Sequence, residues 1–180
     1  EETGLNAFIS VHDTTLGPAL GGMRMWAYDS EDAALTDVLR LSEGMTYKSA
    51  IAHTGLGGGK AVIIGDPAAK SEALFLAMGR FVDSLEGRYI TAEDVNTTVP
   101  DMQIVRRATR WVTGLSREDG GSGNPSPYTA YGVFLGLVEA CNWKFGTSDM
   151  KGRRVAVQGV GAVGGPRVER LVEAGADVTI

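Results

Sequence analysis

The chain has 180 residues, of which 43% are hydrophobic and 22% charged, and its formal net charge is −5. This is the composition of an ordinary globular protein, and the lack of basic runs and of long apolar stretches excludes nucleic acid and the bilayer as expected partners. Cys141 is the only cysteine, so no internal disulfide and no metal site are expected; because the acidic pair Glu1-Glu2 opens the chain in place of a signal peptide, we expect a cytoplasmic protein.

Hydrophobic periodicity and turn residues predict alternating strands and helices. In chain order these are strands at 6–11 and 23–28, a helix at 31–52, a strand at 60–64, a helix at 71–85, a strand at 88–91 and a helix at 99–109. Ser30 is the expected N-cap of the first helix, because its hydroxyl can accept a hydrogen bond from the first turn. Strands that alternate with helices predict an α/β fold.

The strongest domain boundary lies at residues 120–127, a stretch rich in glycine, serine and proline that holds no apolar residue other than proline. After it we predict a helix at 128–144, a strand at 153–158, a helix at 162–174 and the start of a strand at 176–180. We therefore expect a catalytic α/β domain over residues 1–124 and the beginning of a Rossmann-type dinucleotide-binding domain over residues 125–180. Such a domain needs several more strand–helix units, so we expect the sequence to be part of a longer protein.

The segment after the predicted strand at 153–158 matches the pattern G-x-G-x-x-G with Gly159, Gly161 and Gly164. In a dinucleotide-binding unit the first glycine permits a tight turn, the second lets the backbone approach a pyrophosphate, and the third allows the helix to pack closely on the strand. The free N–H groups at the start of the helix would then hold the phosphates of NAD. A glycine-rich turn without a ligand is the alternative, and the residue that separates NAD from NADP would lie beyond Ile180.

A lysine follows the apolar stripe of the helix at 31–52. The stripe consists of Ala34, Val38, Leu41 and Met45, at positions i, i+4, i+7 and i+11, and Lys48 comes three residues later on the same side. Burying an unpaired ammonium group is unfavourable. Lys48 is therefore explained either by an anionic ligand or by a side chain that reaches solvent near the helix end.

Lys60 follows three glycines and opens a predicted buried strand. The glycines would leave room for a ligand, and a desolvated setting would lower the pKa of the lysine and provide a neutral amine; a lysine over a glycine turn is the alternative. Asp94 follows the predicted strand at 88–91, and a carboxylate near two ammonium groups could exchange protons with a substrate amine. Glu93 is the rival acid, and capping of the following turn is the alternative role of Asp94.

Several motifs, in this order, resemble the glutamate/leucine/phenylalanine/valine dehydrogenase family. They are Gly17-Pro-Ala-Leu-Gly-Gly-Met-Arg24, Gly44-Met-Thr-Tyr-Lys48, Gly57-Gly-Gly-Lys60, Thr91-Ala-Glu-Asp-Val95 and Gly123-Asn-Pro-Ser-Pro-Tyr-Thr-Ala-Tyr-Gly132. The resemblance implies an NAD-dependent oxidoreductase that reversibly converts an L-amino acid to a 2-oxo acid and ammonia. It also implies a homo-oligomer and an active site in the cleft between two domains.

The resemblance further implies a role for each matching residue. Lys48 corresponds to the lysine that binds the substrate α-carboxylate, Lys60 to the catalytic lysine that activates water, and Asp94 to the aspartate that exchanges protons with the substrate nitrogen. The other residues expected at the site are Gly21, Gly22 and Met45 beside the substrate and Thr129 near the nicotinamide.

Leu20 and Ala92 bear on the side chain of the substrate. In the glutamate enzymes of the family a lysine precedes the paired glycines, whereas this chain has Leu20 there, and Ala92 at a second pocket position is small and apolar. An apolar amino acid, leucine or another branched-chain one, is expected, since a glutamate carboxylate would be left desolvated and unpaired. Departures from the leucine enzymes at Met23, His53-Thr54 and Asn96 leave leucine, valine and phenylalanine open.

Two other functions fit part of the sequence. A module that binds a dinucleotide without catalysis would need only the glycine pattern, and the presence of Lys48, Lys60 and Asp94 argues against it. The other is that the 180-residue chain is by itself an inactive part of an enzyme.

Overall fold

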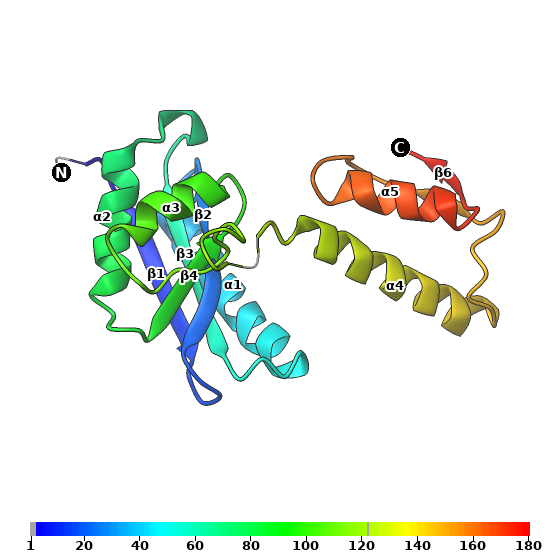
Figure 1. The fold of residues 1–180 in the computed structure, drawn as a ribbon, viewed down its shortest axis with the longest axis horizontal. Coiled ribbons are helices and arrows are strands. Elements are labelled where there is room, and N and C mark those ends of the chain that lie inside the picture. Colours follow the sequence, from blue (N-terminus) through cyan, green and yellow to red (C-terminus); the bar gives the residue numbers. More distant parts are fainter. Residues whose placement is uncertain (1–2, 122) are drawn as a thin grey trace. The chain divides into compact units, whose positions relative to one another are not determined.

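A computed structural model of the chain describes residues 3–121 and 123–180, so that Glu1, Glu2 and Ser122, the last within the predicted linker at 120–127, lie outside the described residues. The chain divides into two compact units, Glu1–Gly123 and Asn124–Ile180 (Figure 1). The predicted α/β fold is confirmed, because both units combine helices with a sheet.

The N-terminal unit is built on a four-stranded sheet with the strand order β1-β3-β2-β4. The strands are β1 (Ala7–Asp13), β2 (Ala19–Trp26), β3 (Gly57–Ile64) and β4 (Tyr89–Glu93). β2 runs parallel to both β3 and β4, whereas β1 runs antiparallel to β3 at the edge. The parallel strands bring the segments that follow β2 and β4 to one end of the sheet.

Helices cover the two faces of this sheet (Figure 1). α1 (Glu31–Ile51) packs on one face in a small cluster with Val62, and α2 (Glu72–Asp83) and α3 (Val99–Arg106) pack on the other over the main core. A short 3-10 helix, η1 (Pro67–Ala69), precedes α2. The predicted N-cap is confirmed, since the Ser30 hydroxyl accepts a hydrogen bond from the backbone N–H of Ala33.

The side chains of β2 alternate between the two faces. The residues of β2 in the main core, on the α2–α3 side, are Ala19, Met23 and Met25. Because successive strand residues point to opposite faces, Leu20, Gly22 and Arg24 belong to the face on which α1 lies. These three residues are half-buried, so this part of the α1 face is not sealed within the unit.

β2 and β3 begin earlier than the sequence predicts. The predicted strands at 23–28 and 60–64 begin at Ala19 and Gly57 in the structure, so the three glycines before Lys60 are buried strand residues rather than a turn. The reason is close packing: a Cβ on Gly21 would lie 1.7 Å from the Gly59 carbonyl oxygen, and one on Gly58 would lie 2.1 Å from the Thr46 hydroxyl. Glycine is ordinarily unfavourable in a strand, and here it permits backbones to approach.

The C-terminal unit contains α4 (Ser126–Phe145), β5 (Arg154–Ala156), α5 (Gly164–Glu173) and β6 (Asp177–Thr179). β5 and β6 are parallel and are joined through α5, which makes a βαβ unit. Leu171 of α5 is fully buried in its core with Met150 and Val157. Among the helices described, none has both the length and the apolar character needed to cross a bilayer.

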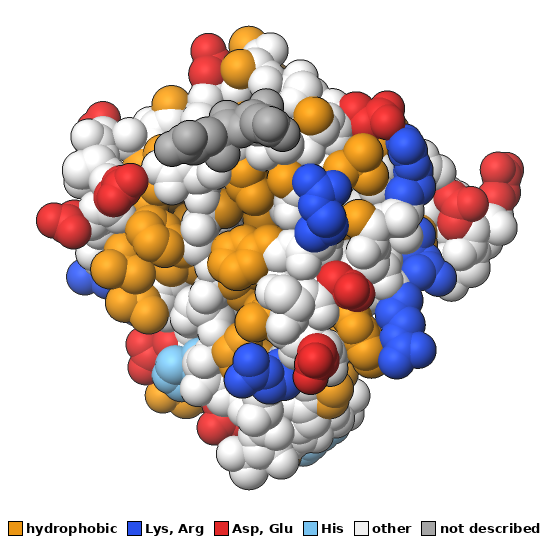
Figure 2. All heavy atoms as spheres, turned by 90° about the vertical axis from the view of Figure 1, so that its left-hand side faces the viewer, with side chains coloured by type: hydrophobic (Ala, Val, Ile, Leu, Met, Phe, Trp, Pro, Cys, Tyr) orange, Lys and Arg blue, Asp and Glu red, His pale blue; other side chains and the backbone are white. Residues whose placement is uncertain are grey.

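Figure 2 views the molecule from the side on which α2 lies. Acidic and basic side chains are interspersed on this face, with apolar side chains between them, and neither sign of charge gathers into one field (Figure 2). Such mixing is typical of a solvated protein surface.

Candidate active site

Lys60 and Asp94 form an ion pair on the α1 face of the sheet. Lys60 lies in the middle of β3, and its side chain is only 6% exposed. Its Nζ atom lies 2.9 Å from Oδ2 of Asp94, which directly follows β4. The parallel arrangement of β3, β2 and β4 thus brings together two residues that are 34 positions apart in the sequence.

The backbone of Asp94, rather than its carboxylate, stabilises the turn that follows. The Asp94 N–H donates to the Thr97 hydroxyl at 2.9 Å, and the Thr97 N–H donates to the Asp94 carbonyl at 3.0 Å. The Thr97 hydroxyl in turn donates to the Met23 carbonyl of β2 at 2.7 Å. This turn holds the Asp94 backbone in place and leaves its carboxylate to meet cations.

Burial and charge act in opposite directions on the two partners. Burial lowers the pKa of the Lys60 ammonium, and the neighbouring positive charge of Arg24 acts in the same direction, against the attraction of Asp94. Burial by itself would raise the pKa of Asp94, but the charges and hydrogen bonds of Lys60 and Arg24 more than offset it and hold the pKa below its usual value. Asp94 therefore stays ionised, and Lys60 gives up its proton more readily than a lysine in water.

Glu93, the rival acid, lies elsewhere. Burial raises its pKa, with a hydrogen bond from the backbone of Val99 acting against that rise. Among the described ion pairs Lys60 meets Asp94 and not Glu93. The contact with Lys60 therefore distinguishes Asp94 from Glu93, which the sequence alone could not do.

The paired glycines of β2 make room for this ion pair. In the sheet, Gly21 is opposite Thr91 and Gly22 opposite Ala92. A Cβ on Gly22 would lie 2.6 Å from the Asp94 Cβ and 2.7 Å from the Glu93 carbonyl oxygen. Neither neighbour can move without shifting the strand or the acid, so the position of Asp94 depends on glycine at residue 22.

Replacing Gly22 with alanine is expected to displace Asp94 and to destabilise the fold by about 1–3 kcal/mol, the usual effect of overpacking. The matched control is Gly79→Ala in α2, where the added Cβ would lie 2.8 Å from the Ala108 Cβ and 2.9 Å from the Val105 carbonyl oxygen. Thermal unfolding should show a lower melting temperature for both variants. An NMR titration should show a changed Lys60 pKa for Gly22→Ala only, and equal Lys60 values in the two variants would contradict the assignment.

Lys48 does not lie on the buried face of α1. The predicted stripe is confirmed at Ala34 and Val38, which are buried, and is wrong further along the helix. The buried residues of α1 are Ala34, Val38, Ser42 and Ser49, whereas the Lys48 side chain is exposed in the last turn. Two serines belong to this face because small side chains let the helix approach the sheet, and the Ser42 hydroxyl lies 2.8 Å from the Ser10 hydroxyl of β1. Met45, one of the expected substrate contacts, is half-buried at the border of the face.

Leu20 and Ala92 are half-buried on the same face as Asp94. Leu20 is opposite Gly58 of β3 and Ile90 of β4, and Ala92 is opposite Gly22. Ile90 was not singled out from the sequence, although strand alternation from Ala92 places it on this face. An apolar wall of Leu20, Ile90 and Ala92 therefore stands beside the ion pair.

Arg24 is a second residue that the sequence analysis did not assign to the site. Its Nε donates to Asp94 Oδ2 at 3.1 Å, and its Nη1 donates to Asp37 Oδ2 of α1 at 2.9 Å. Strand alternation could have found it, because Arg24 follows Leu20 and Gly22 at steps of two residues. A charged residue on a half-buried strand also requires partners.

The glycine pattern lies in the C-terminal unit, between β5 and α5. Gly159 has a φ of 83°, which L side chains rarely adopt. A Cβ on Gly164 would lie 2.0 Å from the Gly159 carbonyl oxygen, whereas Gly161 has open space around it. The N-cap residue of α5, Val163, makes no side-chain cap. In the first turn the Gly165 N–H donates to the Gly161 carbonyl at 2.9 Å, and Pro166 has no N–H.

Thr129 lies in the first turn of α4 and is exposed. Its hydroxyl donates a hydrogen bond to the Pro125 carbonyl at 3.2 Å.

In the described part of the chain, no three His, Cys, Asp or Glu side chains form a group that could hold a metal ion.

Comparison with known proteins places the chain in a family of amino-acid dehydrogenases. The family model described as the Glu/Leu/Phe/Val dehydrogenase dimerisation domain matches residues 1–111, and that of Glutamate/Leucine/Phenylalanine/Valine dehydrogenase matches residues 120–180. The chain belongs to this family.

Among the relatives, leucine dehydrogenase of Bacillus cereus is 61% identical over 91% of this chain and 45% of its own length. Valine dehydrogenase of Streptomyces virginiae is 55% identical over 99% of this chain and 50% of its own. The crystal structure of L-tryptophan dehydrogenase from Nostoc punctiforme matches with a TM-score of 0.72 at 44% identity, over 99% of this chain and 50% of that one. The chain thus spans about half the length of the curated relatives it matches.

Proposed function

We propose that this chain, within a protein of its relatives' full length, catalyses the reversible NAD-dependent oxidative deamination of an apolar L-amino acid to the 2-oxo acid and ammonia. The observation that carries the proposal is the buried Lys60–Asp94 pair beside the apolar wall of Leu20, Ile90 and Ala92. Identity of 61% to a leucine dehydrogenase supports leucine or another branched-chain amino acid as the substrate. Valine and phenylalanine remain the alternatives, because relatives of both kinds match at 55% and 51%.

In this proposal the ion pair handles protons. Lys60, whose pKa is lowered by burial, takes a proton from the attacking water and then stabilises the charge that develops on the substrate. Asp94, ionised beside Lys60 and Arg24, exchanges a proton with the substrate nitrogen. Lys48, exposed near the end of α1, binds the α-carboxylate of the substrate.

The cofactor we propose is NAD. Gly159, Gly161 and Gly164 fit a pyrophosphate in their local geometry: a turn with positive φ, an open backbone and an uncapped helix start. When bound, NAD accepts the hydride from the substrate Cα. Thr129 is proposed to lie near the nicotinamide. We propose that residues 1–124 form the catalytic domain and that residues 125–180 begin the dinucleotide-binding domain.

We also propose a homo-oligomer in the cytoplasm. The matching family model is described as a dimerisation domain, which supports the first part. The single cysteine supports a reducing compartment.

A direct test compares the full-length protein with the 180-residue chain, each given NAD and L-leucine and followed by NADH absorbance. We expect NADH from the full-length protein and none from the chain alone, because the described cofactor unit has a sheet of only two strands and provides no complete site for the adenosine half. NADH formation by the 180-residue chain would contradict this expectation. A full-length protein that reduces NAD with none of leucine, valine and phenylalanine would overturn the proposed function.

A further inference from the structure

Arg24 connects the candidate active site to α1. Through Nε it donates to Asp94 Oδ2 at 3.1 Å, and through Nη1 it donates to Asp37 Oδ2 at 2.9 Å. Two different nitrogen atoms of one planar group are therefore fixed by two carboxylates, and the orientation of the guanidinium is determined at both ends. Lys60 cannot supply this directional constraint on Asp94, because an ammonium group is a point charge.

Both cations meet the same oxygen of Asp94. The Oδ2 atom lies 2.9 Å from Lys60 Nζ and 3.1 Å from Arg24 Nε. Both contacts are made by Oδ2 and not by Oδ1. Because the Asp94 side chain is 22% exposed, water is partly excluded from these contacts and the ion pairs are stronger than on an open surface.

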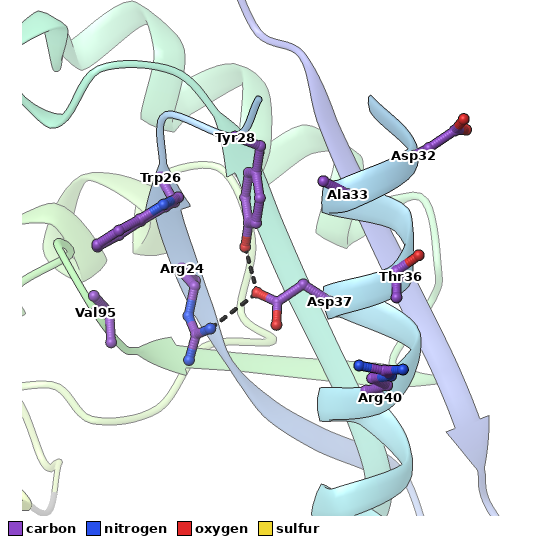
Figure 3. Close-up of a pocket in the computed structure, with 9 residues that line it drawn as sticks. All are labelled: Arg24, Trp26, Tyr28, Asp32, Ala33, Thr36, Asp37, Arg40 and Val95. Atoms are coloured by element: carbon purple, nitrogen blue, oxygen red, sulfur yellow. Dashed lines mark hydrogen bonds and ion pairs between the residues drawn. The ribbon is translucent and has the colours of Figure 1, made fainter. Parts of the chain in front are cut away.

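Asp37 is itself fixed by Tyr28. The Tyr28 hydroxyl donates to Asp37 Oδ2 at 2.5 Å, the same oxygen that Arg24 holds. Figure 3 shows Arg24 and Tyr28 pointing toward Asp37 of α1, in a pocket of about 670 Å³ that Arg40 also lines. A continuous series of contacts thus runs from Lys60 through Asp94, Arg24 and Asp37 to Tyr28.

We propose that Arg24 is a positioning residue of the candidate active site: it orients the Asp94 carboxylate and sets the balance of charge in the Lys60–Asp94 pair, and Asp37 fixes Arg24. The positioning role of Arg24 rests on the proposed function, whereas its contacts and their electrostatic effect on Lys60 do not.

The charged groups around the pair fix the direction of the expected change. Arg24 of β2 and Asp37 of α1 act on the Lys60 pKa in opposite directions, the first lowering and the second raising it, and Tyr89 of β4 carries a pKa raised by burial. Without the Arg24 side chain, Lys60 is the cation that remains paired with Asp94, and water can enter the site more easily. Each of these changes favours the protonated lysine, so the Lys60 pKa must rise when Arg24 becomes neutral.

The experiment is an NMR titration of lysine Cε in the 180-residue chain, with the Lys60 signal assigned from a Lys60→Arg variant. We expect Arg24→Gln to raise the Lys60 pKa by about one unit, the effect of one charge at close range. The matched control is Arg40→Gln, which removes an exposed cation from the same pocket without touching Asp94 and should leave the Lys60 pKa within the error of the titration. An equal Lys60 pKa in folded Arg24→Gln and in the unaltered chain would overturn the proposal.

Arg24→Lys separates charge from orientation. It keeps the cation but cannot hold Asp94 and Asp37 together, so in the full-length protein kcat should fall by about 10-fold or more while KM changes little. Its Lys60 pKa should stay near that of the unaltered chain, and an unchanged kcat would overturn the positioning role even if Arg24→Gln does not fold. The two proposals can fail separately. If the Lys60 pKa shifts in Arg24→Gln but the unaltered full-length protein oxidises no amino acid, the proposed function is overturned. The influence of Arg24 on the Lys60–Asp94 pair is then still established.

Discussion

In the full-length protein, Lys60→Ala is expected to lower kcat by at least ~100-fold, since general acid–base and charge-stabilising contributions are each of that size. The fold should survive. Asp94 keeps Arg24 as a partner at 3.1 Å, so removing Lys60 does not leave a buried carboxylate unpaired. Steady-state NADH formation gives kcat, and circular dichroism checks the fold.

Lys70 provides the matched control for this substitution. It too pairs with an aspartate, at 2.6 Å from Asp101 Oδ2, but its side chain is 26% exposed and it lies beside α3 instead of at the candidate site. Asp101 also accepts hydrogen bonds from the backbone and hydroxyl of Thr98 in a capping box. Lys70→Ala should therefore lower the melting temperature without lowering kcat, and a Lys60→Ala enzyme with kcat within a few-fold of normal would show that Lys60 has only a structural role.

The second large effect concerns the substrate side chain. We expect kcat/KM for branched aliphatic amino acids to exceed that for L-glutamate by a factor of about 100 to several thousand, since an unpaired buried charge costs about 3–5 kcal/mol. The reason is the apolar wall formed by Leu20, Ile90 and Ala92, which offers no cation to a second carboxylate. Apolar burial, at about 0.8 kcal/mol per CH₂, separates leucine from valine by about tenfold at most.

Leu20→Lys is the reciprocal test. A lysine at this position places a cation in the wall, so it should weaken the use of leucine and admit glutamate. The control is Leu16→Lys, which changes an exposed leucine four residues earlier and should alter neither substrate. Measurements of kcat/KM for leucine, valine, phenylalanine and glutamate at one pH decide the matter, and glutamate used as well as leucine by the unaltered enzyme would contradict the role of Leu20.

The order and type of the elements could be predicted from the sequence, because periodicity, caps and turns are local properties. The helix at 31–52 and its Ser30 cap show this, as does the strand–turn–helix around Gly159. The starts of β2 and β3 could not be predicted from the sequence, because glycines such as Gly21 and Gly58 are unfavourable in strands by local preference. Their place in the sheet is fixed by backbones and side chains far away in the sequence, such as Gly59 and Thr46.

The candidate site was predictable to the extent that single residues carried the chemistry. Lys60 and Asp94 stood out as charges beside buried strands, and their 2.9 Å contact needed only parallel strands to form. Arg24 and Asp37 were not assigned, because their function depends on which atoms they meet across the sheet and α1. The buried face of α1 could be predicted at Ala34 and Val38, which are apolar. It could not be predicted at Ser42 and Ser49, because packing and hydrogen bonding bury these polar residues.

The contact between the Gly21 and Gly59 backbones limits which residues of this sheet can be substituted. A Cβ on Gly21 would lie 1.7 Å from a carbonyl oxygen of the next strand, so a mutant library at this residue would contain almost only unfolded variants. The backbones of β2 and β3 thus approach too closely here for a side chain at residue 21. A change of the proposed amino-acid preference therefore has to come from side chains, such as those of Leu20, Met45, Ile90 and Ala92, or from segments outside these 180 residues.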